Sequence, residues 1–453
     1  MNPLTNIKNI YFIGIGGIGM SALARYFNTQ GVTVSGYDKT PTVLTADLER
    51  EGIQIHFDDN IEKIDKQATI VVYTPAVPAD HSELNYCKNN GYNVVKRSDV
   101  LNWITENAFT IAIAGTHGKT TTTSMTAHIL RHSEYGCNAF LGGIASNYDT
   151  NFWSHENNVV VVEADEYDRS FLKLAPNIAV VTAVDPDHLD IYGTPEEVLK
   201  AFGQFTDKIK SGGLLIQKMG TEFPVHHSGK TVHTYGFNMD NATYHTANLK
   251  VVDGAYHFDL VHNAGVLKNV VLNMGGLHNV ENATAAIAIA LRLGISDEKI
   301  INAVAAFKGV KRRFEYKLKT SNKVLIDDYA HHPEELNALI SGVRSLYPNE
   351  KMTLVFQPHL YSRTQDQAKG FMEVLDKADQ VILLPIYPAR ELPIPGVSSD
   401  MLLNGMQLTN KQVMSKDALM QWAATTNEKL IVMAGAGDID VCINQVQEIF
   451  SKL

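Results

Sequence analysis

The chain has 453 residues, which is too long for one ordinary hydrophobic core, so several domains are expected. Hydrophobic residues make up 45% of it and charged residues 19%, a composition typical of globular proteins and unlike that of disordered or fibrous ones. The formal net charge is −10 and there is no long basic run, which argues against non-specific binding to nucleic acid or anionic membranes, because both require a positive surface.

The N-terminal segment, Met1 to Asn9, lacks a basic stretch followed by an apolar one, so no signal peptide is predicted. No stretch of the sequence approaches the roughly 18 uninterrupted apolar residues of a membrane span. The three cysteines, Cys87, Cys137 and Cys442, lack the C-x-x-C spacing and are predicted to be reduced thiols. We therefore expect a cytoplasmic protein that binds no nucleic acid and does not insert into a membrane.

Short apolar runs rich in β-branched residues alternate with longer helical patterns along most of the chain. Runs that are apolar at every position are typical of parallel strands buried on both faces. The alternation therefore predicts an α/β protein with doubly wound sheets. The predicted strands are Ile10–Ile13, Ile70–Tyr73, Thr110–Ala114, Val159–Val162, Ile178–Val181, Val324–Ile326, Thr353–Phe356, Val381–Leu384 and Leu430–Ala434.

Two changes in this pattern suggest domain boundaries. The polar stretch Thr105-Glu106-Asn107 separates one strand–helix series from the next, and the basic segment from Lys308 to Arg313 precedes another. Residues 228–275 differ, with alternating short strands and turns, and are predicted to be an antiparallel addition to the middle domain. We expect domains at residues 1–107, 108–311 and 312–453.

The first glycine loop, Gly14-Ile15-Gly16-Gly17-Ile18-Gly19, follows the predicted strand Ile10–Ile13. It matches the pattern G-x-G-x-x-G, and Asp38 follows the next apparent strand, Val32–Val34. Alone, this pattern is typical of a dinucleotide-binding turn, in which glycines admit a diphosphate to the start of a helix. The alternative is a glycine turn that serves packing only.

The phosphate loop, Gly115-Thr116-His117-Gly118-Lys119-Thr120, with Thr121 after it, lies between the predicted strand Thr110–Ala114 and a helical pattern that runs to Leu130. Unpaired N–H groups at such a turn, with the positive end of the helix dipole, form an anion site. Lys119 is expected to reach the β and γ phosphates of ATP, and the Thr120 hydroxyl to hold Mg²⁺. The spacing departs from the full Walker pattern, because Ile113 stands where its first glycine would be. Two such loops in one chain suggest two different phosphorylated ligands.

Acidic residues follow two predicted strands of the middle domain. Val159–Val162 leads into the segment from Glu163 to Asp168, and Ile178–Val181 leads into the segment from Asp185 to Asp190. Since the carboxyl ends of parallel strands face the ligand crevice, these acids suit a divalent metal bound by oxygen, with His188 as a nitrogen ligand. The alternative is a pair of solvated turns.

Three further polar clusters lie towards the C-terminus. Gly276 to Asn282 opens an alanine-rich helix on which Asn279 and Asn282 share one face, so they either cap that helix or bind a base or ribose. Asp327 to Pro333 and Phe356 to Arg363 each follow a predicted strand. Either could be an ordinary turn, but together they favour a second wall of an active site.

The order and spacing of these elements resemble those of the Mur ligase family over essentially the whole chain. The segments that carry the resemblance are Gly14 to Gly19, Gly115 to Thr121, Glu163 to Asp168, Asp187-His188, His278 to Asn282, Arg312 to Glu315, Asp327 to Pro333, Phe356 to Arg363, Tyr387 to Glu391 and Gly435 to Ile439.

The resemblance implies three α/β domains: an N-terminal Rossmann-like domain for a UDP-sugar, a central P-loop ATPase-like domain with a mixed sheet, and a C-terminal Rossmann-like domain that receives an amino acid. It implies ATP-dependent ligation of L-alanine to the lactyl carboxylate of UDP-N-acetylmuramate through an acyl phosphate, with release of ADP and phosphate, in peptidoglycan precursor synthesis. The first glycine loop and Asp38 then bind the UDP-sugar. We expect ATP and two Mg²⁺ ions, with Mn²⁺ as an alternative, in a monomer or weak homodimer.

Residue roles follow from the same resemblance. Thr120 and Glu163 would hold one Mg²⁺, and Glu163 and His188 a second, while His188 or His331 would act as general base. The residues expected to bind ATP are Gly115, Thr116, His117, Gly118, Lys119, Thr120, Thr121, Asn279, Asn282, Arg313 and Asp328. Those expected to face the substrate carboxylate and the incoming amino acid are Tyr329, His331, His359 and Arg363. The expected catalytic residues are Lys119, His188, His331 and Arg363.

Two other functions remain open. A recycling ligase would attach an intact tripeptide to the same UDP-sugar; the segments Arg169 to Leu172 and Tyr387 to Glu391 favour the L-alanine-adding activity instead. An NAD-dependent oxidoreductase built on the first glycine loop would leave the phosphate loop without a role.

Overall fold

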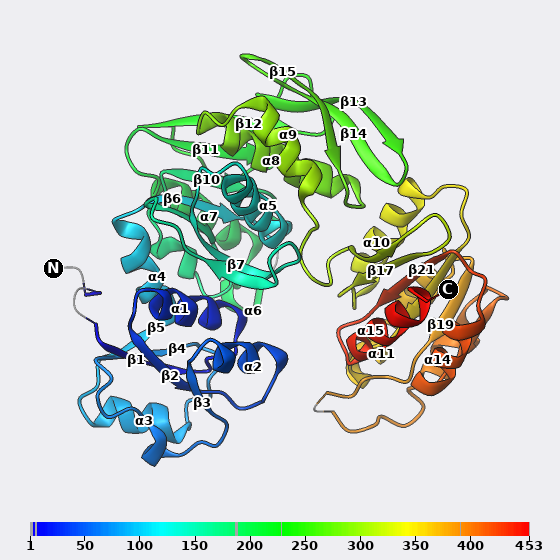
Figure 1. Ribbon diagram of the computed structural model, residues 1–453, viewed down its shortest axis with the longest axis horizontal. Helices are drawn as coiled ribbons and strands as arrows, with labels where there is room; N and C mark the ends of the chain where they lie inside the picture. Colours follow the sequence, from blue (N-terminus) through cyan, green and yellow to red (C-terminus); the bar gives the residue numbers. More distant parts are fainter. Residues whose placement is uncertain (1–2, 5–6, 186–188, 228, 390, 453) are drawn as a thin grey trace. The chain divides into compact units, whose positions relative to one another are not determined.

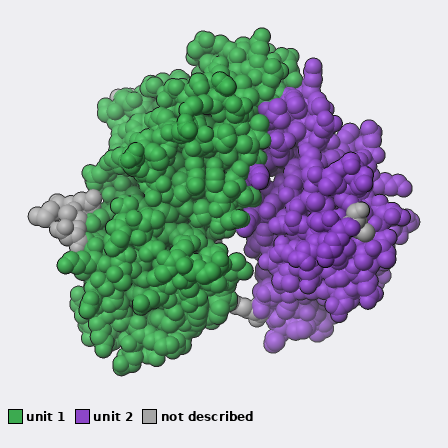
Figure 2. All heavy atoms as spheres, viewed as in Figure 1, with its two compact units in different colours: residues 1–248, 258–270, 281–307 green, residues 249–257, 271–280, 308–453 purple. Residues whose placement is uncertain are grey.

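The computed structural model describes residues 3–4, 7–185, 189–227, 229–389 and 391–452, which form three sheets with their helices (Figure 1). Two compact units can be separated (Figure 2). The first comprises residues 1–248, 258–270 and 281–307, and the second comprises residues 249–257, 271–280 and 308–453. Within the described part of the chain, no helix has the length and apolarity needed to cross a membrane.

The first sheet consists of five parallel strands in the order β3-β2-β1-β4-β5. Both faces of β1 are buried, because Ile10 and Phe12 join one hydrophobic cluster while Tyr11 and Ile13 join another. The strands are β1 (Asn9–Ile13), β2 (Thr33–Tyr37), β3 (Gln54–His56), β4 (Ile70–Tyr73) and β5 (Val94–Lys96). The helices are α1 (Ile18–Thr29), α2 (Val43–Arg50), η1 (Ile61–Lys63), α3 (Ser82–Asn89) and α4 (Arg97–Glu106).

The second sheet has ten strands in the order β15-β14-β13-β12-β11-β10-β6-β9-β7-β8. Within it, β6 pairs in parallel with β10 and β9, so the carboxyl ends of these three strands meet at one edge. The strands are β6 (Phe109–Ala114), β7 (Asn138–Ala145), β8 (Thr150–Trp153), β9 (Val159–Glu163), β10 (Ile178–Val181), β11 (Gly213–Lys218), β12 (Lys230–Gly236), β13 (Tyr244–Val252), β14 (Ala255–His262) and β15 (Gly265–Leu272). The helices are α5 (Lys119–His132), η2 (Ser170–Lys173), α6 (Leu189–Tyr192), α7 (Pro195–Asp207), α8 (Leu277–Arg292) and α9 (Asp297–Ala306).

The predicted antiparallel addition at residues 228–275 is only partly correct. β12 pairs in parallel with both β11 and β13, because residues 237–243 form a connection long enough for β13 to start beside the end of β12 and run in the same direction. β13, β14 and β15 are joined by connections of two residues, at 253–254 and 263–264, which only antiparallel neighbours permit. The second sheet is therefore mixed, and β7 pairs with β8 in antiparallel fashion at its other end.

The third sheet has the order β16-β17-β21-β18-β19-β20, in which only the β16–β17 pair is antiparallel. The carboxyl ends of β17 and β18 flank that of β21. The strands are β16 (Glu315–Lys319), β17 (Val324–Asp328), β18 (Met352–Phe356), β19 (Gln380–Leu383), β20 (Lys411–Val413) and β21 (Leu430–Ala434). The helices are α10 (Pro333–Leu346), α11 (Tyr361–Asp366), α12 (Ala368–Leu375), α13 (Ser399–Gly405), α14 (Lys416–Thr425) and α15 (Ile439–Phe450).

The predicted α/β class is confirmed, since all nine predicted apolar runs fall on strands. Each sheet lies within one of the predicted segments 1–107, 108–311 and 312–453. The boundaries themselves remain a prediction, because the compact units divide the chain in a different way.

Candidate active site

The phosphate loop between β6 and α5 is tightly enclosed. Gly115 has a φ of +136° and Gly118 a φ of +79°, a region that favours glycine. A Cβ at Gly115 would lie 2.0 Å from the Thr182 hydroxyl, and one at Gly118 would lie 2.6 Å from the Asn282 side-chain oxygen. The Thr182 hydroxyl also donates to the carbonyl of His117. Backbone conformation and space both require these two glycines.

The polar side chains of the loop meet acids at the ends of the neighbouring strands. The Thr120 hydroxyl donates to Oε1 of Glu163, the last residue of β9, over 3.1 Å. Beyond β10, the Asp185 amide donates to the Thr116 hydroxyl over 3.1 Å, and the His117 ring lies 3.5 Å from the Asp185 carboxylate. Thr121 is buried in the first turn of α5. The loop and the acids are therefore adjacent because β6 lies between β9 and β10.

The Lys119 side chain folds back over the loop. Its ammonium donates to the Gly115 carbonyl over 2.6 Å and to Oε1 of Glu166 over 2.8 Å. The side chain of Glu166 is only 1% exposed and that of Lys119 15% exposed. The cation expected to reach the phosphates is thus part of a largely buried ion pair.

Glu163 and Thr120 provide oxygen atoms that suit Mg²⁺, which proteins usually bind through one or two carboxylates with water and phosphate oxygens completing the shell. Gly142 of β7 makes room for this carboxylate, because a Cβ there would lie 2.1 Å from Oε2 of Glu163. The other predicted metal ligand, His188, lies outside the described residues. Among those that are described, no group of three or more histidine, cysteine or acidic residues is arranged to hold a metal ion.

The first glycine loop links β1 to α1, and Asp38 determines its shape. Oδ2 of Asp38 accepts from the Gly16 amide over 2.7 Å, and Oδ1 accepts from the Thr40 amide over 3.2 Å. The amides of Gly14 and Ile15 donate to the carbonyl of the residue before Asp38, over 2.8 and 3.0 Å. Asp38 therefore supports the loop from behind.

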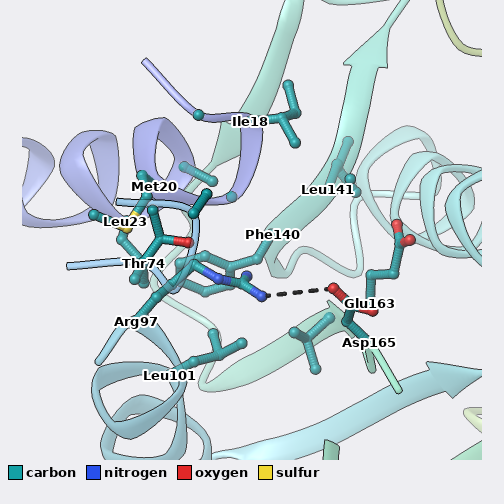
Figure 3. Close-up of a pocket in the computed structure, with 16 residues that line it drawn as sticks. Ile18, Met20, Leu23, Thr74, Arg97, Leu101, Phe140, Leu141, Glu163 and Asp165 are labelled. Carbon is teal, nitrogen blue, oxygen red and sulfur yellow. Dashed lines mark ion pairs between the residues drawn. The ribbon is translucent and has the colours of Figure 1, made fainter. Parts of the chain in front are cut away.

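The start of α1 borders a cavity of about 330 Å³, to which Gly17, Ile18 and Gly19 contribute (Figure 3). Arg97, the first residue of α4, points across this cavity towards Asp165, with 4.0 Å between Nη2 and Oδ2. A Cβ at Gly19 would lie 2.7 Å from Nη1 of Arg97, so the helix start accommodates the guanidinium closely. Glu163 also lines the cavity. A second cavity of about 250 Å³ shares Arg97 and Asp165 with the first.

The two asparagines of α8 have different surroundings. Oδ1 of Asn282 accepts from the Thr122 hydroxyl over 3.2 Å and lies against Gly118, so Asn282 forms part of the wall of the phosphate loop. Asn279 is 3% exposed, and its side-chain amide donates to the Gly275 carbonyl over 2.6 Å. Asn279 thus fixes the chain at the start of its own helix.

In the second unit, Asp328 ends β17 and binds backbone on both sides. Its carboxylate accepts from the amides of Phe314 and Ala330 over 2.7 and 2.8 Å. Burial raises the pKa of Asp328 to about 6, and these two hydrogen bonds and the charge of Arg313 partly offset that rise. The Arg313 amide donates to the Val310 carbonyl over 3.1 Å. Asp328 therefore shapes the segment that carries Arg313.

The second unit also brings together Tyr329, His331, His359 and Arg363. The rings of Tyr329 and His331 are 5.2 Å apart, and those of His331 and His359 are 6.2 Å apart. Nη1 of Arg363 lies 3.2 Å from Nδ1 of His359. Burial, then the charges of Arg363 and His331, lowers the pKa of His359. These residues follow β17 and β18, which explains why the two clusters meet.

Three models of one family match successive parts of the chain: "Mur ligase family, catalytic domain" at residues 9–108, "Mur ligase middle domain" at 113–290 and "Mur ligase, glutamate ligase domain" at 312–437. The UDP-N-acetylmuramate–L-alanine ligase of Cytophaga hutchinsonii is 47% identical, and the match covers 98% of this chain and 97% of that protein. The chain belongs to the Mur ligase family. The protein of the same name from Porphyromonas gingivalis W83 is also 47% identical, over 99% of this chain and all of its own length.

Solved structures of Mur ligases share the fold. The UDP-N-acetylmuramate-alanine ligase from Thermotoga maritima superposes with a TM-score of 0.82 at 28% identity, over 98% of this chain and 99% of its own. A murein peptide ligase from Psychrobacter arcticus superposes with a TM-score of 0.67 at 22% identity, over 98% and 99% of the two chains. The predicted three-domain α/β fold of an ATP-dependent ligase is confirmed.

Two side chains of this candidate site have no role in the sequence-based prediction. Arg97 lines both cavities, and Glu166 binds Lys119, yet the sequence pattern assigns neither of them an individual role. Arg97 directly follows β5, so the rule that places ligand-binding groups at the carboxyl ends of strands could have identified it. Nothing local marks Glu166 among the acids around it, because its partner lies 47 residues away.

Proposed function

We propose that this chain catalyses the ATP-dependent ligation of L-alanine to the lactyl carboxylate of UDP-N-acetylmuramate, releasing ADP and phosphate, in cytoplasmic synthesis of peptidoglycan precursors. The full-length relatives named UDP-N-acetylmuramate–L-alanine ligase, at 45 to 47% identity, support this choice within the family.

One observation carries the proposal. Glu163 lines the cavity at the start of α1 and accepts a hydrogen bond from Thr120 of the phosphate loop. A sugar nucleotide in that cavity and ATP on the loop would therefore approach the same carboxylate from two sides. An enzyme that transfers a phosphoryl group from ATP to a sugar-nucleotide carboxylate needs this proximity.

We assign the residues as follows. The first glycine loop, supported by Asp38, receives the UDP diphosphate, and the phosphate loop receives ATP. Asn279, Asn282, Arg313 and Asp328 serve the nucleotide, and Tyr329, His331, His359 and Arg363 serve the carboxylate and L-alanine. The three domains are residues 1–107, 108–311 and 312–453, in a monomer or weak homodimer.

The carbon of the lactyl carboxylate is a poor electrophile, so the carboxylate must be activated before an amine can attack it. A lactyl carboxylate oxygen attacks the γ phosphorus of ATP and ADP leaves, which produces an acyl phosphate. The loop amides and Lys119 hold the crowded phosphate oxygens and stabilise their charge. Mg²⁺, for which Mn²⁺ is an alternative, supplies further charge neutralisation when bound at Thr120 and Glu163 and at Glu163 and His188. The amine of L-alanine then attacks the acyl carbon, and phosphate leaves.

The attacking amine must lose a proton, and we assign His331 as the base that accepts it. Nδ1 of His331 lies 2.9 Å from the Tyr329 carbonyl and 3.2 Å from Oε2 of Glu335, so it carries the proton in the neutral ring. Nε2 is then the free base. His188 is the alternative base. Arg363, beside His359, binds the carboxylate of the incoming amino acid.

Phosphate release from ATP tests the proposal. The purified chain is incubated with UDP-N-acetylmuramate and, separately, L-alanine, L-serine, glycine or the murein tripeptide. We expect L-alanine to stimulate release most strongly. Stimulation by tripeptide alone would identify a recycling ligase instead, and turnover of NADH without use of ATP would exclude both ligases. Lys119→Ala should abolish release and leave binding of the UDP-sugar largely intact; a comparable loss of that binding would mean that the two glycine loops are assigned to the wrong ligands.

A further inference from the structure

The acids after β9 include one that the reaction outlined above does not use. Glu166 lies three positions beyond Glu163 and is nearly inaccessible to solvent, yet its carboxylate reaches the ammonium of Lys119. Lysine side chains are flexible and gain rotational freedom when they are unbound. A buried acid that holds this lysine therefore fixes the position of its ammonium relative to a ligand bound at the loop.

We propose that Glu166 is a positioning residue for ATP, which holds the Lys119 ammonium over the phosphate loop before the nucleotide arrives. This inference rests on the proposed role of that loop in binding ATP. Glu166 acts through Lys119 and itself contacts neither the phosphates nor the metal.

The number of N–H donors on the Lys119 ammonium indicates that the ion pair orients the lysine for ATP and does not block ATP binding. A lysine ammonium carries three N–H groups. Two of them are engaged by the Gly115 carbonyl and the Glu166 carboxylate. The third is left for a phosphate oxygen, so ATP can bind without breaking the ion pair. The two fixed acceptors also restrict the direction in which this third N–H points.

Glu166 is itself held firmly by the turn that follows β9. Its carbonyl accepts from the Tyr192 hydroxyl over 2.6 Å and from the Arg169 amide over 2.9 Å. The guanidinium of Arg169 lies 4.8 Å from the centre of the Tyr192 ring. Because the backbone is fixed at this point, the carboxylate is a stable reference for Lys119. A preorganised charge of this kind loses less freedom when the ligand binds.

A double-mutant cycle measured by calorimetric binding of a non-hydrolysable ATP analogue with Mg²⁺ tests the inference without the sugar nucleotide. We expect Glu166→Ala to weaken analogue binding about tenfold, as expected for the loss of a charge-assisted hydrogen bond that orients the cation. Glu166→Gln, which keeps the size and one acceptor oxygen, should recover part of the loss. In a Lys119→Ala background, Glu166→Ala should have no further effect, because the two residues act as one unit.

Asp207→Asn is the matched control. Asp207 pairs with the largely buried Lys230 over 3.3 Å in the same unit and lies outside the proposed site. This variant should lower Tm without changing analogue binding. A further loss for Glu166→Ala in the Lys119→Ala background would make Glu166 a metal or nucleotide ligand and overturn the inference. Tighter binding by Glu166→Ala would mean that the ion pair blocks ATP, and a binding loss matched by equal loss of UDP-sugar binding would indicate a structural role only. If the analogue binds as expected but L-alanine gives no phosphate release, the proposed ligation is wrong while the positioning role stands.

Discussion

Gly142→Ala should damage catalysis without damaging the fold. Gly142 lies in β7 and its φ is outside the left-handed region, so alanine fits the backbone there and should leave Tm unchanged or slightly raised. The new methyl carbon would lie 2.1, 2.7 and 2.9 Å from Oε2, Cδ and Oε1 of Glu163. Ordinary contact begins near 3.4 Å, so the carboxylate must recede by roughly 1 Å. If Glu163 holds the metal as proposed, a displacement of this size should cost on the order of 100-fold in rate.

The assay is phosphate release over a series of Mg²⁺ concentrations, together with Tm. We expect kcat to fall about 100-fold and the Mg²⁺ concentration for half-maximal rate to rise. Glu163→Asp in the Gly142→Ala background shortens the carboxylate by one methylene and relieves the contact, so the two losses should not multiply. A variant with near-normal kcat and an unchanged Mg²⁺ requirement would refute the view that Glu163 holds the metal.

Three further changes test other parts of the chain. Asp38→Asn weakens the support of the first glycine loop and should raise the KM for the UDP-sugar several-fold while the KM for ATP stays constant; an equal rise for ATP would contradict this assignment. Arg97→Gln should raise the KM for the UDP-sugar about tenfold, with partial recovery in Arg97→Lys, and normal KM values would exclude Arg97 as a ligand. Burial raises the pKa of Asp327 to about 7, from a value near 4 in an unfolded chain. Between these two pH values the folded state keeps a proton on Asp327 that the unfolded state loses, so the free energy of unfolding falls as the pH rises from about 4 to about 7. Asp327→Asn should therefore reduce the difference in Tm between pH 5 and pH 8, and an unchanged difference would rule out this titration.

The sequence predicted the sheets well wherever strands are apolar at every position. Val159–Val162 and Leu430–Ala434 are buried at every position, and strands buried on both faces have such uninterrupted apolar runs. β8 was not predicted, because its four residues, Thr150–Trp153, show neither alternation nor an apolar run. The parallel pairing of β12 depends on the path of a connection, which local pattern does not encode.

For the site, glycine was the informative residue. Gly115 and Gly118 stand out in the sequence because their backbone conformations and close neighbours exclude side chains. The positions of the clusters Asp327 to Pro333 and Phe356 to Arg363 after strand ends favour a second wall of a site, whereas the roles of Tyr329 and His359 come only from the family resemblance. The pairing of Glu166 with Lys119 and the insertion of Arg97 over Gly19 arise only when distant segments pack. Which of several neighbouring acids pairs with a given lysine is decided by tertiary packing and not by the local sequence.

The contact between Asn282 and the phosphate loop bears on how the protein is made. Asn282 lies against Gly118 and accepts from Thr122, which precedes it by 160 residues. At roughly 5 to 20 residues per second, the ribosome adds the residues between Thr122 and Asn282 in about 10 to 30 s. The phosphate loop is therefore synthesised well before Asn282, which packs against it. A nascent chain that ends before α8 therefore has an open loop. A nucleotide bound at the phosphate loop would therefore stabilise the protein only after α8 has been synthesised and has packed against the loop.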